Sequence, residues 1–356
     1  MELVAKEAVS IGEWNRFVGE SPNGLLYHVY EWIEALAETQ GLTLKRYELY
    51  AEGVGDRLVG VMPILLGQFG LIRVAGSPLI VEDTPYLGPV VPDHLLPSAL
   101  KAVQAAIARE NIHFLRVSLP GMPSHDGLRI LRDNRFNCVI KHTHILDLSK
   151  GSKALWSGME GRCRTAVRRA ERSGLQVVWI DGNNEASSAI EAYYQLVENV
   201  YHRQGKQPPN SVGLYRRLWE KFHSRGDLHL LLARLDGCTI AGVMLACHRK
   251  RIYYLDGASD YRFANLCASN LLLWRAIEWA SLEGYQEFDF VGSDIPRLAK
   301  FKASFGGELV MHLCVEWASS RVVQLVRDCY GSYVKGCIAK MKWLRHVIAA
   351  ARSTTH

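Results

Sequence analysis

The chain has 356 residues, a net charge of +6 and 48% hydrophobic residues. This length suits two domains, each able to bury its own core, and no apolar run in the sequence is long enough to span a bilayer. The eight cysteines form no Cys-x-x-Cys pair and the 13 histidines form no His-x-x-x-His pair, which argues against a metal site. Residues 1–7 lack the pattern of a signal peptide, so we expect a cytoplasmic protein with reduced cysteines.

The first half is predicted to combine helices with strands. A helix over residues 28–39 places Tyr30, Ile33 and Leu36 on one face, as expected of a helix that covers a core. The expected elements are helices over residues 11–17, 28–39 and 96–110, and strands over residues 46–51, 58–66, 71–75, 114–119 and 143–148.

Residues 76–89 interrupt this order with a stretch rich in glycine and proline. Such a stretch cannot form a regular helix or a central strand. Loops with fixed turns often line ligand clefts, and a surface loop without a binding role is an equally open alternative.

The second half is predicted to begin after a boundary near residues 149–152. Residues 156–172 are expected to form one basic helix with five arginines, and Gly174 follows in the position that commonly ends a helix. The other expected elements are helices over residues 186–203, 211–224 and 268–283, and strands over residues 230–234, 240–245 and 287–291. The domains are therefore expected at residues 1–149 and 150–318, followed by a basic helical tail over residues 319–356.

The tail carries an amphipathic, basic pattern over residues 321–351, with an expected break near Gly331 or Gly336. Three alternatives remain open for this segment: packing on the second domain, dimerisation, or peripheral contact with an anionic membrane surface.

A repeated phrase links the two halves. Residues 58–63 (LVGVMP) in the first half correspond to residues 240–245 (IAGVML) in the second. Each phrase follows a strand that ends in a polar turn, and each is followed further on by a helix and another strand. The repeat predicts two related α/β domains, with a cleft between them where ligands often bind.

This order of strands, helix and strand resembles the GNAT acyltransferase fold, and the two units together resemble the Fem superfamily of aminoacyl- and acyltransferases. The resemblance covers roughly residues 10–318. Its motifs are His28-x-x-Glu31-Trp32, Gly60-Val61-Met62-Pro63, Ser77-Pro78, Arg168-Arg169-Ala170 before Gly174, Tyr201-His202-Arg203-Gln204-Gly205, Phe288-Asp289-Phe290 and Phe301-Lys302-x-x-Phe305-Gly306. It implies an α/β (α+β) class with two tandem GNAT-like domains, each a mixed central sheet flanked by helices.

The resemblance implies catalytic roles for Lys302, Asp289 and Tyr254. A surface position is the alternative for Lys302, because most lysines are exposed. Asp289 lies in an apolar strand, where a carboxylate must be paired or face a cleft. Two alternatives are equally open for it: a structural ion pair with Arg or Lys, or a role as base or in orienting the acceptor. Tyr254 could donate to the leaving group, although strand aromatics more often belong to a core.

Binding roles follow from the same resemblance. Arg168 and Arg169 match a basic pair of the family, and Arg203 follows Tyr201-His202 at a predicted helix end. Arginine suits phosphate through bidentate contacts, while a solvated helix face is the alternative. Asp256 and Ser293 are the remaining candidates for contact with the acceptor substrate.

The donor is expected near residues 262–269. In ordinary acetyltransferases a glycine-rich loop at this place presents backbone amides to the pyrophosphate of coenzyme A at a helix N-terminus. Here the glycines are missing, and the candidate donor-binding residues are Arg262, Asn265, Ala268 and Ser269.

The sequence thus predicts a transferase that moves an aminoacyl or acyl group to an amine of a cell-envelope precursor or related small molecule. Classical Fem members use aminoacyl-tRNA and often carry a coiled-coil arm, for which no long heptad run is present here. No tightly bound cofactor and no metal is expected; the donor would be aminoacyl-tRNA or acyl-CoA. A location at the inner face of the membrane is added because Fem-like acceptors are often lipid-linked.

Two rivals stay open. One is an acyl-CoA-dependent N-acyltransferase of polysaccharide or natural-product biosynthesis. The other is a non-catalytic binding protein on a degenerate GNAT scaffold, supported by the basic residues of the helix predicted over 156–172.

Overall fold

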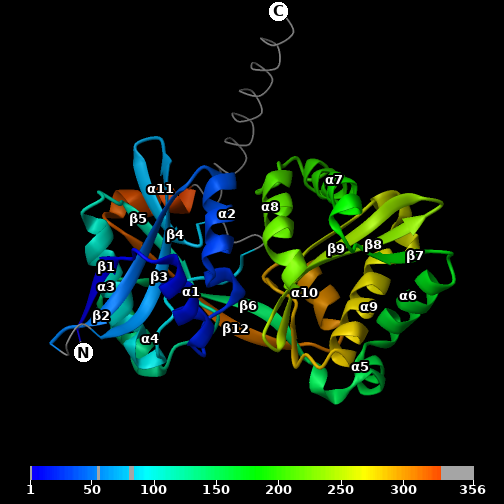
Figure 1. Cartoon of the computed structure of the whole chain (residues 1–356), viewed down its shortest axis with the longest axis horizontal. Helices are drawn as coiled ribbons and strands as arrows, with labels where there is room; N and C mark the ends of the chain where they lie inside the picture. The colour runs from blue at the N-terminus through cyan, green and yellow to red at the C-terminus, as the bar shows by residue number, and fades with distance from the viewer. Residues whose placement is uncertain (1, 54–56, 80–83, 330–356) are drawn as a thin grey trace, which may run out of the picture.

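The computed structural model describes residues 2–53, 57–79 and 84–329. Its strands form one mixed sheet of 12 strands in the order β1-β2-β3-β4-β5-β12-β6-β11-β10-β9-β8-β7. Helices cover the sheet, and the molecule has two lobes joined through β6 and β12 (Figure 1). Because β6 and β12 sit in the middle of the strand order, the sheet runs without a break from one lobe to the other.

The elements have the following bounds. The strands are β1 (Leu3–Glu7), β2 (Thr43–Ala51), β3 (Leu58–Phe69), β4 (Ile72–Ser77), β5 (Phe114–Ser118), β6 (Asn137–Asp147), β7 (Gln176–Trp179), β8 (Leu228–Leu235), β9 (Cys238–His248), β10 (Arg251–Ser259), β11 (Glu287–Asp289) and β12 (Glu308–Ala318). The α-helices are α1 (Ile11–Glu20), α2 (Tyr30–Gln40), α3 (Leu96–Ala108), α4 (His125–Asp133), α5 (Ser152–Gly158), α6 (Gly161–Glu171), α7 (Asn183–His202), α8 (Val212–Phe222), α9 (Ala268–Leu282), α10 (Pro296–Ala303) and α11 (Arg321–Cys329). The short 3-10 helices η1 (Leu26–His28) and η5 (Tyr261–Leu266) bear on the site described below.

The predicted duplication is confirmed by the strand pairing. In the first half, β3 lies antiparallel between β2 and β4, and β4 lies parallel to β5 with α3 as the crossover. In the second half, β9 lies antiparallel between β8 and β10, and β10 lies parallel to β11 with α9 as the crossover. The repeated phrases occupy equivalent places in β3 and β9.

The two halves exchange their last strands. β12, from the end of the second half, pairs with β5 of the first. β6, from the end of the first half, pairs with β11 of the second, and β6 and β12 pair with each other between them. The division at residue 149 stays a prediction; in space, strands from both sides of it alternate at the centre of the sheet.

The glycine in each repeated phrase makes room for a neighbouring element. A Cβ at Gly60 would lie 2.1 Å from a methyl carbon of Val91 and 2.9 Å from the carbonyl oxygen of Val90. A Cβ at Gly242 would lie 2.4 Å from a ring carbon of Tyr193 in α7. Such distances are far below van der Waals contact, so only glycine allows these approaches. Val90, beside Gly60, and Tyr193, beside Gly242, both support the candidate site described below.

Two predicted elements differ from the structure. The basic helix over residues 156–172 is two helices, α5 and α6, because the backbone extends at Met159 and the N–H of Glu160 bonds to the carbonyl of Ser304 (2.9 Å). The strand over residues 287–291 ends at Asp289, because Val291 has a positive φ. In the tail, the structure describes α11 as far as Cys329, and the expected break near Gly331 or Gly336 lies outside the described residues.

One hydrophobic cluster joins the halves. It contains buried residues of α1 and α2 from the first half and of α7 and α8 from the second, and α2 faces α8 near the middle of the molecule (Figure 1). Trp32 of α2 is fully buried there, its ring centroid 5.3 Å from that of Phe222 in α8. Its indole N–H also donates to the hydroxyl of Thr84 (2.9 Å).

Replacing Trp32 with alanine is expected to lower the free energy of unfolding by about 3–5 kcal/mol, since it removes a fully buried aromatic side chain. Urea denaturation followed by circular dichroism measures the change. Leu282→Ala is the matched control, because Leu282 is 75% exposed; equal losses in both variants would contradict the account of this interface.

Candidate active site

The strands β10 and β11 diverge at the point where the predicted catalytic residues gather. They lie parallel but pair only over Arg251–Tyr253 and Glu287–Asp289. β10 then continues to Ser259, whereas the chain after β11 turns through Val291 and Gly292, with φ of 50° and 53°. A positive φ at a β-branched residue is strained, and such strain clusters at functional sites.

Asp289 ends β11 and is 1% exposed. Its Oδ1 accepts hydrogen bonds from the hydroxyl of Thr143 (2.6 Å) and the N–H of Val291 (2.8 Å). Its Oδ2 accepts one from the hydroxyl of Tyr86 (3.1 Å). Burial raises the pKa of this carboxyl, and these hydrogen bonds oppose the rise. A carboxylate with a raised pKa is better suited to act as a general base near neutral pH.

Lys302 reaches the same place from α10. It is 7% exposed, so the surface alternative for this lysine is wrong. Its ammonium donates to the carbonyls of Val291 and Gly292, the latter at 2.6 Å. Burial lowers the pKa of Lys302 to about 8, while the nearby charges of Asp289 and Asp256 raise it. The strained turn after β11 therefore holds both charged groups: its N–H binds the carboxylate and its carbonyls bind the ammonium.

Tyr254 lies on β10 beside the lysine. The ammonium of Lys302 is 5.7 Å from the centroid of the Tyr254 ring, within the range of a cation–π contact. Burial raises the pKa of the Tyr254 hydroxyl, so it stays protonated and able to donate.

Asp256 follows a bulge in β10. The register with β9 shifts between Tyr254 and Asp256, so Leu255 is an extra residue. The Oδ2 atom of Asp256 accepts from the hydroxyls of Tyr193 (2.9 Å) and Tyr215 (3.3 Å). Burial raises the pKa of this carboxyl as well. Tyr193 is the residue for which Gly242 makes room.

Ser293 belongs to the same buried centre. It is 6% exposed, and its hydroxyl lies 2.8 Å from Nδ1 of His144 on β6. Burial, and next the charge of Lys302, lower the pKa of His144. The structure thus brings together Lys302, Asp289, Tyr254, Asp256 and Ser293.

A second group of predicted residues surrounds η5 and the start of α9. Arg262 is exposed and forms an ion pair with Asp260 (2.6 Å). The guanidinium of Arg203, at the end of α7, lies 4.7 Å from the centroid of the Tyr261 ring. In this group Asn265 is exposed, Ser269 is half-buried and Ala268 is buried. Arg203 and Arg262 therefore flank one short segment.

Arg168 and Arg169 lie elsewhere, on the exposed side of α6. The guanidinium of Arg168 lies over the Trp156 ring, 5.4 Å from its centroid. Helix α6 packs along α9 (Figure 1), and Arg275 of α9 pairs with Glu171 at 3.1 Å. These arginines thus lie beside the middle of α9, near Trp274 and Arg275, and apart from the buried centre.

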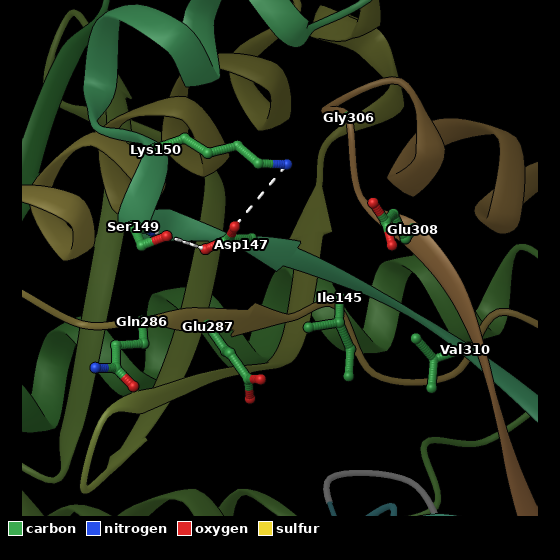
Figure 2. A pocket seen from close by; sticks show the side chains of 9 residues that line it. All are labelled: Ile145, Asp147, Ser149, Lys150, Gln286, Glu287, Gly306, Glu308 and Val310. Carbon is green, nitrogen blue, oxygen red and sulfur yellow. Dashed lines mark hydrogen bonds and ion pairs between the residues drawn. The ribbon is translucent and has the colours of Figure 1, made fainter.

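A pocket of about 560 Å³ lies on β6, β11 and β12, where the halves meet. Asp147, Glu287 and Glu308 give it three carboxylates, and Figure 2 shows the Lys150 amine turned toward Asp147, at 4.0 Å. Glu287 and Asp289 are two residues apart on β11, so both point to one face of the sheet. None of the predicted site residues lines this pocket.

Several residues of the site were not predicted. Tyr86 and Thr143 donate to Asp289, and His144 contacts Ser293. Only Tyr86 had a sequence signal, because it lies in the Gly/Pro-rich stretch. Residues 84–89 of that stretch are buried, so a surface loop is wrong for them; residues 80–83 lie outside the described part.

The described residues contain neither a metal-binding cluster nor a membrane-spanning helix. In that part of the chain, no three His, Cys, Asp or Glu side chains are grouped so that they could hold a metal ion. No helix in the same ranges is long and apolar enough to cross a membrane.

Comparisons with known proteins bear on the fold and on the second half of the chain. Residues 158–303 match the acetyltransferase (GNAT) domain family. The match includes Asp289 and Lys302 and the segment from η5 to α9. No curated protein matched the chain.

Solved structures share the fold over most of the chain. FemX is 18% identical, covers 88% of this chain and 97% of its own, and has a TM-score of 0.64. A tandem GNAT protein from the clavulanic acid biosynthesis pathway is 13% identical, with coverage of 90% and 99% and a TM-score of 0.57. L-PGS from Bacillus licheniformis is 12% identical, with coverage of 83% and 94% and a TM-score of 0.51. The α/β fold is thus a tandem GNAT fold.

Proposed function

We propose that this protein is a GNAT-type transferase that moves an acyl or aminoacyl group from a phosphate-bearing donor to an amine of a cell-envelope precursor. The observation that carries the proposal is that one strained turn, at the divergence of β10 and β11, binds two buried groups of opposite charge, Asp289 and Lys302. Both lie in the segment that matches an acetyltransferase domain.

The chemistry follows from these two groups. The acceptor nitrogen forms a bond to the acyl carbon, the bond from that carbon to the leaving sulfur or oxygen breaks, and the nitrogen loses a proton. Asp289, with its raised pKa, is suited to take that proton. Lys302, as a cation, is suited to stabilise the negative charge that develops on the carbonyl oxygen and the leaving group.

Tyr254 supports the departure of the leaving group. Its hydroxyl stays protonated because burial raises its pKa. A hydroxyl on the ring beside the Lys302 ammonium can donate a hydrogen bond to the leaving thiolate or alkoxide and so stabilise its charge as the bond breaks. Asp256 and Ser293 line the same centre and are proposed to orient the acceptor.

The donor is proposed to bind at η5 and the start of α9. The first N–H groups of a helix lack intrahelical partners and favour phosphate. Arg203 and Arg262 lie at the start of η5, which leads into α9, and Arg168 and Arg169 lie on the neighbouring α6. Both acyl-CoA and aminoacyl-tRNA carry phosphates that would fit such surroundings, and the match to an acetyltransferase domain favours acyl-CoA.

The acceptor is proposed to lie where the halves meet. The pocket on β6, β11 and β12 holds three carboxylates, of which Asp147 pairs with Lys150 and Glu287 with Arg251, and a protonated amine of the acceptor would take the place of these cations. Glu287 is also two residues from Asp289 on the same face. The enzyme would act in the cytoplasm at the inner face of the membrane. Val322 and Leu325, 68% and 63% exposed on α11, give the basic tail an apolar face for such contact.

Donor binding tests the proposal. Coenzyme A, acetyl-CoA or charged tRNA should raise the melting temperature, because a ligand that binds only the folded state stabilises it. The double replacement of Arg203 and Arg262 by alanine should weaken the dissociation constant about ten-fold or more, since charge-assisted contacts to phosphate are lost. Arg129→Ala, at an exposed ion pair of α4, is the control. An unchanged melting temperature with all three ligands would refute this donor site.

A second function, non-catalytic binding on a GNAT scaffold, is favoured by one observation. Cys267, at the start of α9, has φ of 58° and carries a side chain where the glycine-rich loop of acetyltransferases would have none. A protein of this class would bind charged and uncharged tRNA alike and would transfer nothing.

A further inference from the structure

Residues 84–88 form a buried loop, and residues of the first half make hydrogen bonds to almost every residue of it. The hydrogen bonds run from Trp32 Nε1 to Thr84 Oγ1 (2.9 Å), from Ser118 Oγ to Pro85 O (2.6 Å), from Leu87 N to Ser118 O (2.9 Å), between His28 Nε2 and Leu87 O (3.0 Å), and from Gly88 N to Ser77 Oγ (2.9 Å). Val90 adds a bridge to Val61 of β3, beside Gly60. The loop is therefore fixed from α2, η1, β3, β4 and β5 at once.

His28 shows how firmly the loop is held. Burial lowers the pKa of His28 to about 4, so the ring is neutral. Its Nδ1 accepts from the N–H of Leu25 (3.1 Å), which leaves Nε2 as the donor to the carbonyl of Leu87. The motif that begins at His28 thus serves to hold this loop.

Tyr86, in the middle of this loop, crosses to the second half. Its side chain is 1% exposed, and its hydroxyl donates to Oδ2 of Asp289. Its ring packs edge-on against Tyr27 and His312, with centroids 6.5 Å and 5.0 Å away. A fixed loop of the first half therefore directs one hydroxyl at the carboxylate of the second.

We propose that Tyr86 is a positioning residue through which the first half sets the orientation and the ionisation of Asp289. The inference rests on the proposed function for the role of Asp289 as proton acceptor. Thr143 and Val291 occupy Oδ1, and Tyr86 donates to Oδ2, the oxygen left to face the acceptor nitrogen. The two halves must be joined for this arrangement, because the donor and the acceptor of the Tyr86 bond come from different halves.

The hydrogen bond from Tyr86 to Asp289 determines the direction in which the pKa of Asp289 changes when the hydroxyl is removed. Burial raises the pKa of Tyr86 well above its usual range, so the hydroxyl remains a donor. A donor to the ionised form of a carboxyl lowers its pKa, and the Tyr86 bond does so at Asp289. Removing the hydroxyl therefore raises the pKa of Asp289 and moves the acidic limb of the rate profile to higher pH.

Tyr86→Phe tests the proposal in the full chain. With the best donor and acceptor, kcat is expected to fall about ten-fold with KM nearly unchanged, and the acidic limb of kcat/KM to move to higher pH. Tyr27→Phe is the matched control: it lies in the same aromatic cluster, and the three donors to Asp289 among the described residues are Tyr86, Thr143 and Val291. A purely structural role of Tyr86 would lower stability without moving the limb, which would overturn the inference.

A second measurement does not depend on activity. Carbon-13 NMR of protein labelled at aspartate Cγ, assigned with Asp289→Asn, follows the titration of Asp289 directly. A rise of this pKa in Tyr86→Phe but not in Tyr27→Phe supports the coupling even if the wild-type protein transfers no acyl group, in which case only the proposed function fails. An identical titration in wild type and Tyr86→Phe overturns the inference.

Discussion

Replacing Lys302 with methionine is expected to lower the rate of acyl transfer by about 10²–10³-fold, the effect of removing one group that stabilises transition-state charge. Methionine keeps the apolar stem of the side chain but leaves the carbonyls of Val291 and Gly292 without their ammonium donor. The fold should survive with a loss of about 1–3 kcal/mol in the free energy of unfolding. Steady-state kinetics and urea denaturation measure the two effects separately.

Lys300→Met is the matched control, because Lys300 is exposed on the same helix. Near-normal turnover by Lys302→Met would refute the role of Lys302, and equal losses in both variants would point to a general effect on α10.

The same lysine predicts the behaviour at alkaline pH. The pKa of Lys302 is lowered to about 8, so the cation is lost as pH rises through that value. Transfer by the wild-type protein should therefore fall above about pH 8. Lys302→Arg keeps a cation that does not titrate in this range, so its remaining activity should show no such fall. A rate that instead rises through pH 8 would identify Lys302 as the base.

Replacing Asp289 with asparagine is expected to cause the second large loss of activity. Loss of the general base is expected to lower kcat by about 10²–10⁴-fold with a small change in KM. Asparagine has nearly the same shape, and its amide oxygen can still accept from Thr143 and Val291, so the fold should persist. Rapid-quench or steady-state kinetics at saturating donor measure the change.

Asp294→Asn is the control, because Asp294 is exposed and pairs with Lys141 at 3.3 Å. Turnover of Asp289→Asn within a few-fold of the wild type would contradict the assignment of Asp289 and favour Asp256 or Lys302 as the proton acceptor.

Local sequence patterns predicted most elements of this fold. Hydrophobic periodicity located α2, and the repeated phrase predicted two related units that include α3 and α9. The break between α5 and α6 was missed because it depends on a tertiary bond, from the N–H of Glu160 to the carbonyl of Ser304. The early end of β11 was missed because contacts of Asp289 and Lys302 fix the turn after it. The hydrophobic periodicity of the sequence does not indicate such contacts.

The exchange of β6 and β12 between the halves could not be predicted from one sequence. Neither strand shows a simple alternation of buried and exposed residues, and their pairing is set by contacts across the whole chain. The site shows the same limit: 203 positions separate Tyr86 from Asp289, and 146 separate Thr143 from Asp289. The resemblance to a known family pointed to Lys302 and Asp289, whereas the first half's contribution to them became visible only in the structure.

The most direct test of the central claim is an acyl-transfer assay with the full chain. Acetyl-CoA and charged tRNA are each incubated with a set of amine acceptors, and the acylated product is quantified by mass spectrometry for the wild type, Lys302→Met and Lys300→Met. We expect acylated product from at least one donor with the wild type and with Lys300→Met, and about 10²–10³-fold less product with Lys302→Met. Equal product formation by all three proteins, or donor binding without any transfer, would contradict it.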